Sequence, residues 1–193
     1  MKPITKEMFR VRSSEEMYFI LWLNELSETG YIHHYDYENV TFYLSQKRNM
    51  TYTKQLKTKI KYIEKELIKG HSYSPDFDIE WNKKAKGIFF EDALDMIKNK
   101  NVPLFAMNSG LTTFVEIKPV FDRLNMTREF IVNQKWVLRQ DDRYINLVKP
   151  MTGGNSLFAK TFTPRRFIYT DVSMVKRKIT FKTRTLEEYV ATL

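Results

Sequence analysis

Two short stretches of alternating apolar and charged residues constrain the fold more than any other part of this chain. In residues 76–81, Phe77, Ile79 and Trp81 alternate with acidic residues, and in the second stretch Val115 and Ile117 alternate with Phe114, Glu116 and Lys118. A period of two is typical of a β-strand whose two faces differ in polarity. It places Glu116 and Lys118 on one face of the second strand. If the two strands are neighbours, Asp76 at the start of the first strand lies beside them.

Two carboxylates and one ammonium on a common patch suit the metal-assisted hydrolysis of a phosphodiester. A hard divalent cation held by carboxylate oxygens offsets the phosphate charge and lowers the pKa of bound water. Asp76 and Glu116 are the candidate ligands for Mg²⁺ or Mn²⁺, and the backbone carbonyl of Ile117 is a third. Lys118 cannot bind a metal as an ammonium. We expect it to position or help deprotonate the water and to stabilise charge on the phosphate.

The Pro75-Asp76 pair followed by Glu116-x-Lys118 resembles the signature of the PD-(D/E)xK nuclease superfamily. Residues 73–77, Tyr-Ser-Pro-Asp-Phe, are similar to the form seen in small phage and mobile-element endonucleases, including Holliday-junction-resolvase-like enzymes. The resemblance implies a restriction-endonuclease-like core and a DNA substrate. The segment between the two motifs, residues 82–112, is longer than this superfamily usually has.

A helix is expected over residues 13–27, with Gly30 just beyond its end. Its first turn has two interpretations. Ser13 and Glu16 fit a capping box, in which the glutamate returns a hydrogen bond to the cap residue. The family resemblance implies instead that Glu16 reaches the metal site. Glu15 heads a comparable apolar stripe, so periodicity alone does not choose between the two glutamates.

Charge and composition narrow the class of partner. The 193 residues suffice for one domain with a full core, and the net charge of +9 favours a polyanion such as DNA. The lack of cysteine excludes disulfides and thiolate metal sites. Neither a signal-peptide hydrophobic region nor an apolar run of about 18–20 residues is present. We therefore predict a protein of the bacterial host cytoplasm without a membrane partner. Gly153 and Gly154 lack the context of a phosphate-binding loop, so no nucleotide cofactor is expected.

The remaining patterns complete an α/β domain in which a mixed central sheet is flanked by helices. Strands are predicted near residues 40–44, 87–90 and 144–148, helices over 92–99 and 127–138, a loop over 103–110, and a strand giving way to a helix over 54–69. We divide the chain into a nuclease-like core, residues 1–150, and a basic β-rich extension of the same domain, residues 151–193. The extension has predicted strands at 166–170 and 174–182 and a capped helix from Thr185.

Several further residues are candidates for substrate contact. Lysines within 54–69 are placed to follow a phosphate backbone, or they form an ordinary solvated face. Gln134 lies on the apolar side of its predicted helix and is expected either at the active site or in a hydrogen bond to the sheet edge. The pair His33-His34 is expected in a surface loop. The candidate DNA contacts are Arg128, Gln134, Lys135, Arg165 and Arg166.

These observations predict a divalent-metal-dependent DNA endonuclease. The resemblance to phage nucleases implies a role in DNA replication, recombination or packaging. Junction resolution would require a homodimer, because two symmetric cuts need two sites. Two alternatives stay open. One is a non-catalytic DNA- or RNA-binding module in which Glu116 and Lys118 form a plain surface ion pair. The other is a phage structural or interaction protein whose charge is incidental.

Overall fold

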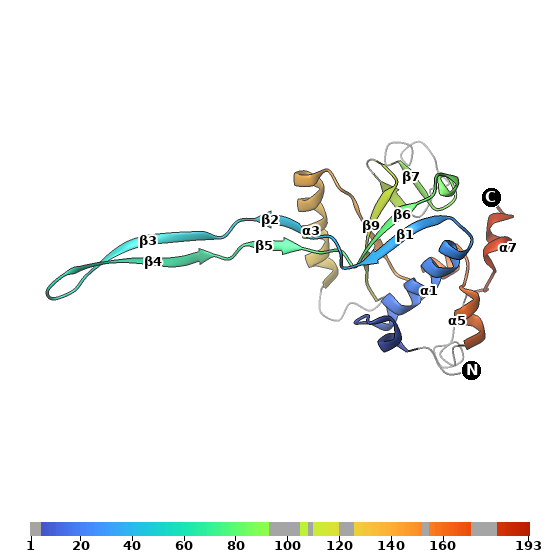
Figure 1. Ribbon diagram of the computed structural model, residues 1–193, viewed down its shortest axis with the longest axis horizontal. Coiled ribbons are helices and arrows are strands. Elements are labelled where there is room, and N and C mark those ends of the chain that lie inside the picture. Colours follow the sequence, from blue (N-terminus) through green and yellow to red (C-terminus); the bar gives the residue numbers. More distant parts are fainter. Residues whose placement is uncertain (1–4, 93–104, 108–109, 120–125, 152–154, 171–180) are drawn as a thin grey trace.

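A mixed four-stranded sheet forms the centre of the computed structural model (Figure 1), which describes residues 5–92, 105–107, 110–119, 126–151, 155–170 and 181–193. The strand order is β1-β6-β9-β10. Antiparallel pairing joins β1 to β6 and β6 to β9, and β10 lies parallel to β9. The mixed α/β architecture is therefore confirmed. The strands are β1 (Ile32–Tyr37), β6 (Phe77–Trp81), β9 (Thr112–Ile117) and β10 (Ile145–Val148).

The helix α1 (Ser14–Glu28) packs across one face of the sheet. It starts as predicted, because the Ser13 side chain accepts a hydrogen bond from the Glu16 backbone N–H at 3.1 Å. Most of its side chains are apolar and buried, so the helix is a central element of the core. Trp22 is fully buried, and its indole N–H donates to the Thr161 hydroxyl at 3.1 Å. That bond satisfies the one polar group of an otherwise apolar side chain.

The helix α3 (Met126–Asp141) covers the opposite face. Successive β9 residues show this division, because Phe114 joins the cluster beneath α3 whereas Val115 joins the cluster beneath α1. The predicted helix over 127–138 is confirmed and is longer than expected. Its predicted apolar side is only partly correct. Ile131 and Leu138 are exposed at 41% and 37%, because the α3-facing cluster is narrow.

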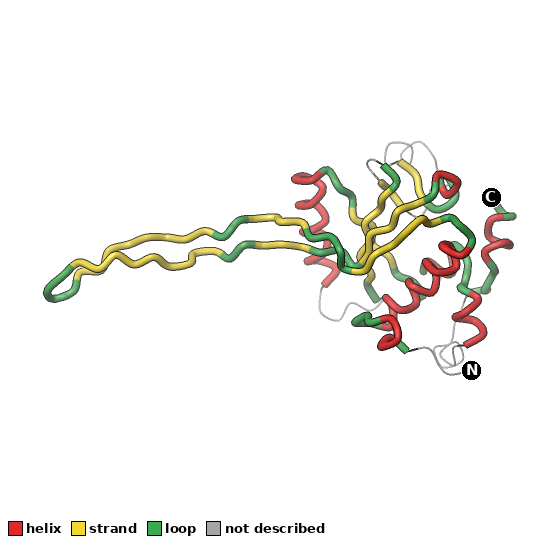
Figure 2. The backbone as a smooth tube through the Cα atoms, viewed as in Figure 1, coloured by secondary structure: helices red, strands yellow, loops and turns green. Residues whose placement is uncertain are grey.

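Two short ribbons joined end to end form an arm that projects from this core, as Figure 2 shows. Its inner ribbon pairs β2 (Phe42–Ser45) with β5 (His71–Tyr73), and its outer ribbon pairs β3 (Arg48–Gln55) with β4 (Ile60–Ile68). The predicted helix in the second half of 54–69 is wrong. Pairing with β3 satisfies that backbone as a strand through Ile68.

Smaller elements complete the core. The short helix η1 (Lys6–Phe9) precedes α1 and contacts it. The connection from β6 to β9 contains η2 (Lys83–Ala85), β7 (Phe90–Asp92) and β8 (Phe105–Met107), with β7 parallel to β8. The predicted loop over 103–110 thus contains a strand, and the strand predicted at 87–90 begins only at Phe90. Most of the predicted helix over 92–99 lies outside the described residues. His33 and His34 are exposed but lie in β1, so their predicted loop is wrong.

The regular elements of the C-terminal region that the structure describes are helices. Its helices are α4 (Leu157–Lys160), α5 (Arg165–Thr170) and α7 (Leu186–Val190). The strand predicted at 166–170 is therefore wrong, because Phe167 packs from α5 into the α1-facing core. Nearly all of the strand predicted at 174–182 lies outside the described residues. The capping box of Thr185 and Glu188 is confirmed. Within the described ranges, no helix combines the length and apolar character needed to cross a lipid bilayer.

Candidate functional site

The two motif strands are neighbours, which is the condition on which the predicted site depended. Phe77 of β6 stands opposite Val115 of β9, so Asp76, just before β6, lies level with the end of β9. One Asp76 carboxylate oxygen, Oδ2, accepts a hydrogen bond from the Ile117 backbone N–H at 2.6 Å. This bond holds the Asp76 carboxylate at the backbone position that separates the other two motif residues, Glu116 and Lys118.

Glu116 is buried, with 6% of its surface exposed, and both its carboxylate oxygens have donors. Oε1 accepts from the Lys118 ammonium at 2.5 Å, and Oε2 accepts from the Tyr73 hydroxyl at 2.6 Å. Tyr73 is a site residue that the sequence reasoning missed, although it stands three positions before Asp76. Its position at the start of the first motif was the signal that would have found it.

Negative charge is in excess at this patch. The pKa of Asp76 is raised to about 7, first by burial and then by the charge of Glu116, whereas the Ile117 N–H and Lys118 oppose the shift. The charge of Glu16 acts in the same direction as that of Glu116. Near neutral pH the patch therefore carries a carboxyl group that a cation would help to ionise.

Glu16 approaches the same patch from the first turn of α1. Its carboxylate accepts hydrogen bonds from the Ser13 hydroxyl, the Arg12 backbone N–H and the Tyr37 hydroxyl, each at 2.8 Å. The contacts with Arg12 and Ser13 tie Glu16 to the start of α1, as the capping interpretation expects, and its reach to a metal stays a prediction. Glu16 is buried, whereas Glu15 is half-buried. Glu16 is also the one of the two whose charge raises the pKa of Asp76.

Two tyrosines flank the carboxylates in matching roles. Tyr37 donates to Glu16, and Tyr73 donates to Glu116. Burial is the largest cause that raises the pKa of both hydroxyls above their ordinary value, and the nearby carboxylates add to it. Both phenols therefore stay protonated across the physiological range. They hold their carboxylates in place without neutralising the charge.

The donor set suits a hard cation that keeps part of its water shell. Within the described ranges, no three His, Asp or Glu side chains form a complete metal-binding group. Asp76 and Glu116 would be joined by a backbone carbonyl. The Ile117 N–H faces Asp76, whereas the next N–H, that of Lys118, bonds Val148 on the other edge of β9 at 3.0 Å. Because the N–H and C=O of one strand residue share an edge, the Ile117 carbonyl faces Asp76. Oxygen donors of this kind fit Mg²⁺ or Mn²⁺.

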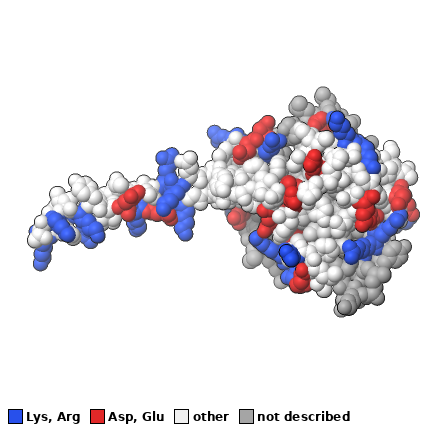
Figure 3. Space-filling view, in the orientation of Figure 1, with Lys and Arg blue, Asp and Glu red and all other residues white. Residues whose placement is uncertain are grey.

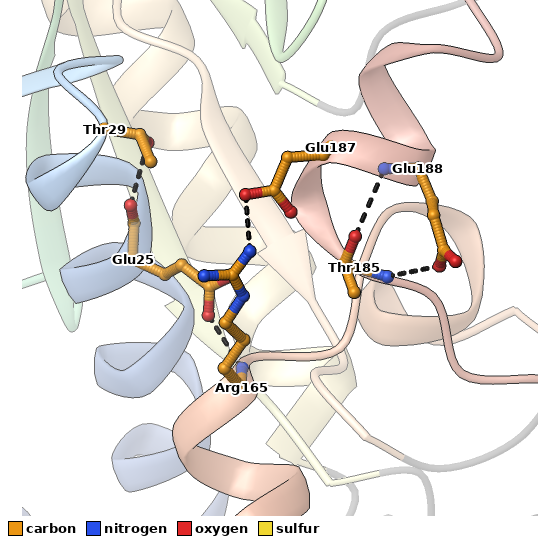
Figure 4. A network of polar contacts seen from close by, with 6 residues as sticks. All are labelled: Glu25, Thr29, Arg165, Thr185, Glu187 and Glu188. Atoms are coloured by element: carbon orange, nitrogen blue, oxygen red, sulfur yellow. Dashed lines mark hydrogen bonds and ion pairs between the residues drawn. The ribbon is translucent and has the colours of Figure 1, made fainter.

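The other predicted contacts are placed apart from this patch. Gln134 donates to the Ile145 carbonyl, which is the sheet-edge interaction and not the active-site one. Arg128 and Lys135 lie exposed on α3. Arg165 on α5 forms an ion pair with Glu187 at 2.5 Å, as Figure 4 shows.

The Arg165 backbone N–H also donates to Glu25, near the far end of α1 from Glu16. Glu25 lies nine positions after Glu16 in the helix, or about 14 Å along the axis. The observed contacts give Arg165 a role in fastening α7 and α5 to α1. Its neighbour Arg166 lies on the same short helix. Contact of either arginine with DNA stays a prediction.

No protein-family model, curated protein or solved structure matches this chain. The likeness to PD-(D/E)xK nucleases therefore depends on the motif residues themselves and on how the fold arranges them. The decisive spatial expectation was that Asp76, Glu116 and Lys118 share one patch, and the hydrogen bonds at the β6–β9 junction bring them together.

Proposed function

We propose that this protein is a divalent-metal-dependent endonuclease that hydrolyses DNA phosphodiester bonds on a restriction-endonuclease-like core. The observation that carries the proposal is the junction of β6 and β9. There Asp76 is bound to the backbone of Ile117 while Glu116 pairs with Lys118. The raised pKa of Asp76 supports it, because strongly shifted carboxyl groups in a charged cluster are typical of functional sites.

Each residue has a separate task in this proposal. Asp76, Glu116 and the Ile117 carbonyl hold Mg²⁺ or Mn²⁺. When bound, such an ion offsets phosphate charge and activates water. Lys118 directs its ammonium into the patch, where it orients the attacking water and donates to a phosphate oxygen as charge develops. Glu16 supports the site directly or through water. In-line attack by water leaves one phosphate end and one hydroxyl end.

The contacts of Glu116 keep it ready for this role. A buried carboxylate needs hydrogen-bond donors, because burial removes the water that would otherwise bind its oxygens. The Lys118 ammonium and the Tyr73 hydroxyl supply one donor to each oxygen of Glu116. Asp76, beside this supported carboxylate, titrates near neutrality. The pair fits an ion-binding site that fills as the pH rises through about 7.

A second candidate function is a non-catalytic nucleic-acid-binding module. The contact that favours it is the Lys118–Glu116 ion pair, in which the ammonium already neutralises one candidate ligand. The pair is not the plain surface pair of that hypothesis, since both side chains are largely buried, at 12% and 8% exposure. A binding module would show salt-dependent affinity for nucleic acid without metal-dependent cleavage. A phage structural or interaction protein would show neither.

The proposal is tested by incubating the protein with supercoiled, linear and branched DNA in the presence of Mg²⁺ or Mn²⁺. We expect cleavage that chelation stops. Asp76→Asn and Lys118→Met should abolish cleavage while DNA affinity, measured separately, is retained. Asp78→Asn is the matched control, because Asp78 lies two residues along β6 and its pKa responds to burial and Asp36. Absence of metal-dependent cleavage on every DNA form would refute the nuclease assignment.

A further inference from the structure

The outer ribbon of the arm lies outside the hydrophobic core. All eight residues of β3 are exposed, and β4 is exposed except for the half-buried Ile63. At about 3.3 Å per residue, β3 alone extends about 26 Å. That length approaches one turn of B-form DNA, about 34 Å. A two-stranded ribbon of this length gains little from its own burial, which points to a partner outside the chain.

The register of the ribbon sorts its charges onto two different faces. Residues paired across an antiparallel ribbon project to the same side. The pairs Met50–Lys65, Tyr52–Ile63 and Lys54–Lys61 therefore form one face, which we call the basic face. The intervening pairs Asn49–Glu66, Thr51–Glu64 and Thr53–Tyr62 form the other, which we call the acidic face.

Observed contacts support this division. On the acidic face, Asn49 donates to Glu64 at 2.6 Å. Lys47 closes the base of that face with an ion pair to Glu66 at 3.0 Å. The basic face carries three lysines and no acidic residue, and two more lysines, Lys57 and Lys59, stand in the turn at the tip.

The arm holds most of the net charge of the chain. Residues 46–70 contain eight basic and two acidic residues, a net charge of +6 out of the +9 of the whole sequence. Figure 3 shows these basic side chains spaced along the arm. A surface of this charge fits a polyanion. Duplex DNA also fits its shape, because the major groove of B-form DNA, about 12 Å wide, admits a two-stranded ribbon.

A second copy of the chain fits the basic face less well. Two copies joined basic face to basic face would set lysines against lysines, which is repulsive. The apolar side chains on this face, Met50, Tyr52 and Ile63, form one small group, in which Tyr52 pairs with Ile63 and which Lys65, Lys54 and Lys61 flank. Between phosphate-binding lysines, such side chains suit contact with base edges and thymine methyl groups.

The root of the arm is also part of the candidate site. The inner strand β5 ends at Tyr73, whose hydroxyl donates to Glu116, and Asp76 follows three residues later. At this root, a hydrogen bond of 2.8 Å between the hydroxyls of Thr41 and Ser74 joins the segment that enters the arm to the segment that leaves it. A duplex held along the arm is therefore led towards the carboxylates.

We propose that the basic face of the arm seats in the major groove of duplex DNA and guides the phosphate backbone to the Asp76–Glu116 patch. The second half of this statement rests on the proposed nuclease function, whereas the first half, DNA binding by one face of the ribbon, does not. The two are tested apart by measuring binding without metal and cleavage with it.

The decisive experiment compares two triple variants that lower the net charge equally. One neutralises the basic face with Lys54→Gln, Lys61→Gln and Lys65→Gln. The matched control changes exposed lysines of the core, with Lys6→Gln, Lys83→Gln and Lys160→Gln. Affinity for a short labelled DNA duplex is measured by fluorescence anisotropy in chelator over a range of salt concentrations. All six side chains are exposed, so both proteins are expected to fold, and circular dichroism checks this.

The basic-face variant should lose affinity on the order of a hundredfold near 0.1 M salt, and its slope of log affinity against log salt should fall by about 2.7. The control should stay within about twofold of the parent protein. Equal losses in the two variants would overturn the proposal, because bulk charge would then explain the binding. Double-stranded RNA should compete more weakly than DNA, since its deep, narrow major groove does not admit a ribbon. Equal competition would overturn the groove assignment.

An arm-shortened protein gives an independent test. Residues 48–68 are replaced by two glycines, which can close the β2–β5 ribbon with a tight turn. Duplex affinity should be lost, while stabilisation by Mg²⁺, which reports on Asp76 and Glu116, should remain. Retained duplex affinity would refute the proposal. So would a loss of dimers, seen by light scattering, with unchanged DNA affinity, because the arm would then bind a second copy. If the parent protein binds DNA through the arm but does not cleave it, the nuclease function is refuted and DNA binding by the arm is retained.

Discussion

Asp76→Asn should make the protein more stable and abolish its response to metal. The carboxyl group of Asp76 is held at a pKa of about 7, against 3.8 for an ordinary aspartate. At about 1.36 kcal/mol per pKa unit, the fold disfavours the ionised group by about 4 kcal/mol. Asparagine keeps an oxygen that can accept the Ile117 N–H and carries no charge. The variant should therefore gain up to about 4 kcal/mol in free energy of unfolding at about pH 8.

The sign of the pH dependence follows from proton counts. Between about pH 4 and pH 7 the folded protein holds a proton on Asp76 that the unfolded chain has released. Stability of the parent protein must then fall as the pH rises through this window. The gap between Asp76→Asn and the parent should widen by about 2.5 kcal/mol from about pH 5 to about pH 8, and nearly vanish below about pH 4.

Urea unfolding followed by tryptophan fluorescence measures this directly, because Trp22 and Trp81 are fully buried and report on the core. The same titration with Mg²⁺ or with chelator at about pH 8 tests the ion site. Added Mg²⁺ should stabilise the parent and the control Asp78→Asn, and leave Asp76→Asn unchanged. The reasoning is refuted if the stability gap is independent of pH, or if Mg²⁺ stabilises all three proteins equally.

Two further substitutions probe the supports of the site. Tyr73→Phe leaves Oε2 of Glu116 without its 2.6 Å donor, which should cost about 1–3 kcal/mol in urea unfolding and weaken Mg²⁺ binding measured by calorimetry; unchanged Mg²⁺ affinity would exclude a ligand role for that oxygen. Ser13→Ala removes the α1 cap and one donor to Glu16, with an expected loss of about 1 kcal/mol in chemical denaturation. A loss of DNA cleavage greater than this destabilisation explains would show that Glu16 acts on the reaction.

The site was predictable because its strands have two chemically different faces. Alternation at residues 76–81 and 113–118 arises from one apolar side packing on α1, and it put Glu116 and Lys118 on one face. The pairing of the two strands, which alternation does not predict, brings Asp76 beside them. What alternation could not supply was the hydrogen-bond partner of each carboxylate. Tyr73 looks like any strand tyrosine until Glu116 is seen beside it.

The arm was missed for the opposite physical reason. A strand is recognisable in a sequence when one of its faces is apolar because that face is buried. The outer ribbon has no buried face. Leu56, Ile60, Ile63 and Leu67 also fit helical spacing, so the pattern in residues 54–69 stayed ambiguous. Pairing with β3 decided it, and pairing is not encoded in either strand alone.

The strand predicted at 166–170 was wrong because tertiary packing overrode the local preference of these residues for a strand. Its aromatic and β-branched residues favour a strand. The observed helix instead directs Phe167 against Tyr18 and Phe158, with ring centroids 5.0 and 5.3 Å away. These contacts couple the start of the chain to its last quarter, a separation over which sequence periodicity carries no signal.

The contact between the inner ribbon and the central sheet allows force applied to the arm to be transmitted to the candidate site. Tyr73 is the last residue of β5, and its hydroxyl contacts the Glu116 carboxylate of the central sheet. No loop therefore separates the inner ribbon from the candidate site. A force that a bound partner exerts on the tip reaches that oxygen through the Tyr73 phenol, while hydrogen bonds from α3 to His71 and Tyr43 hold the same ribbon. Binding by the arm and the chemistry proposed for the site are therefore mechanically coupled. A change in the stiffness of the chain at Tyr73 would alter both.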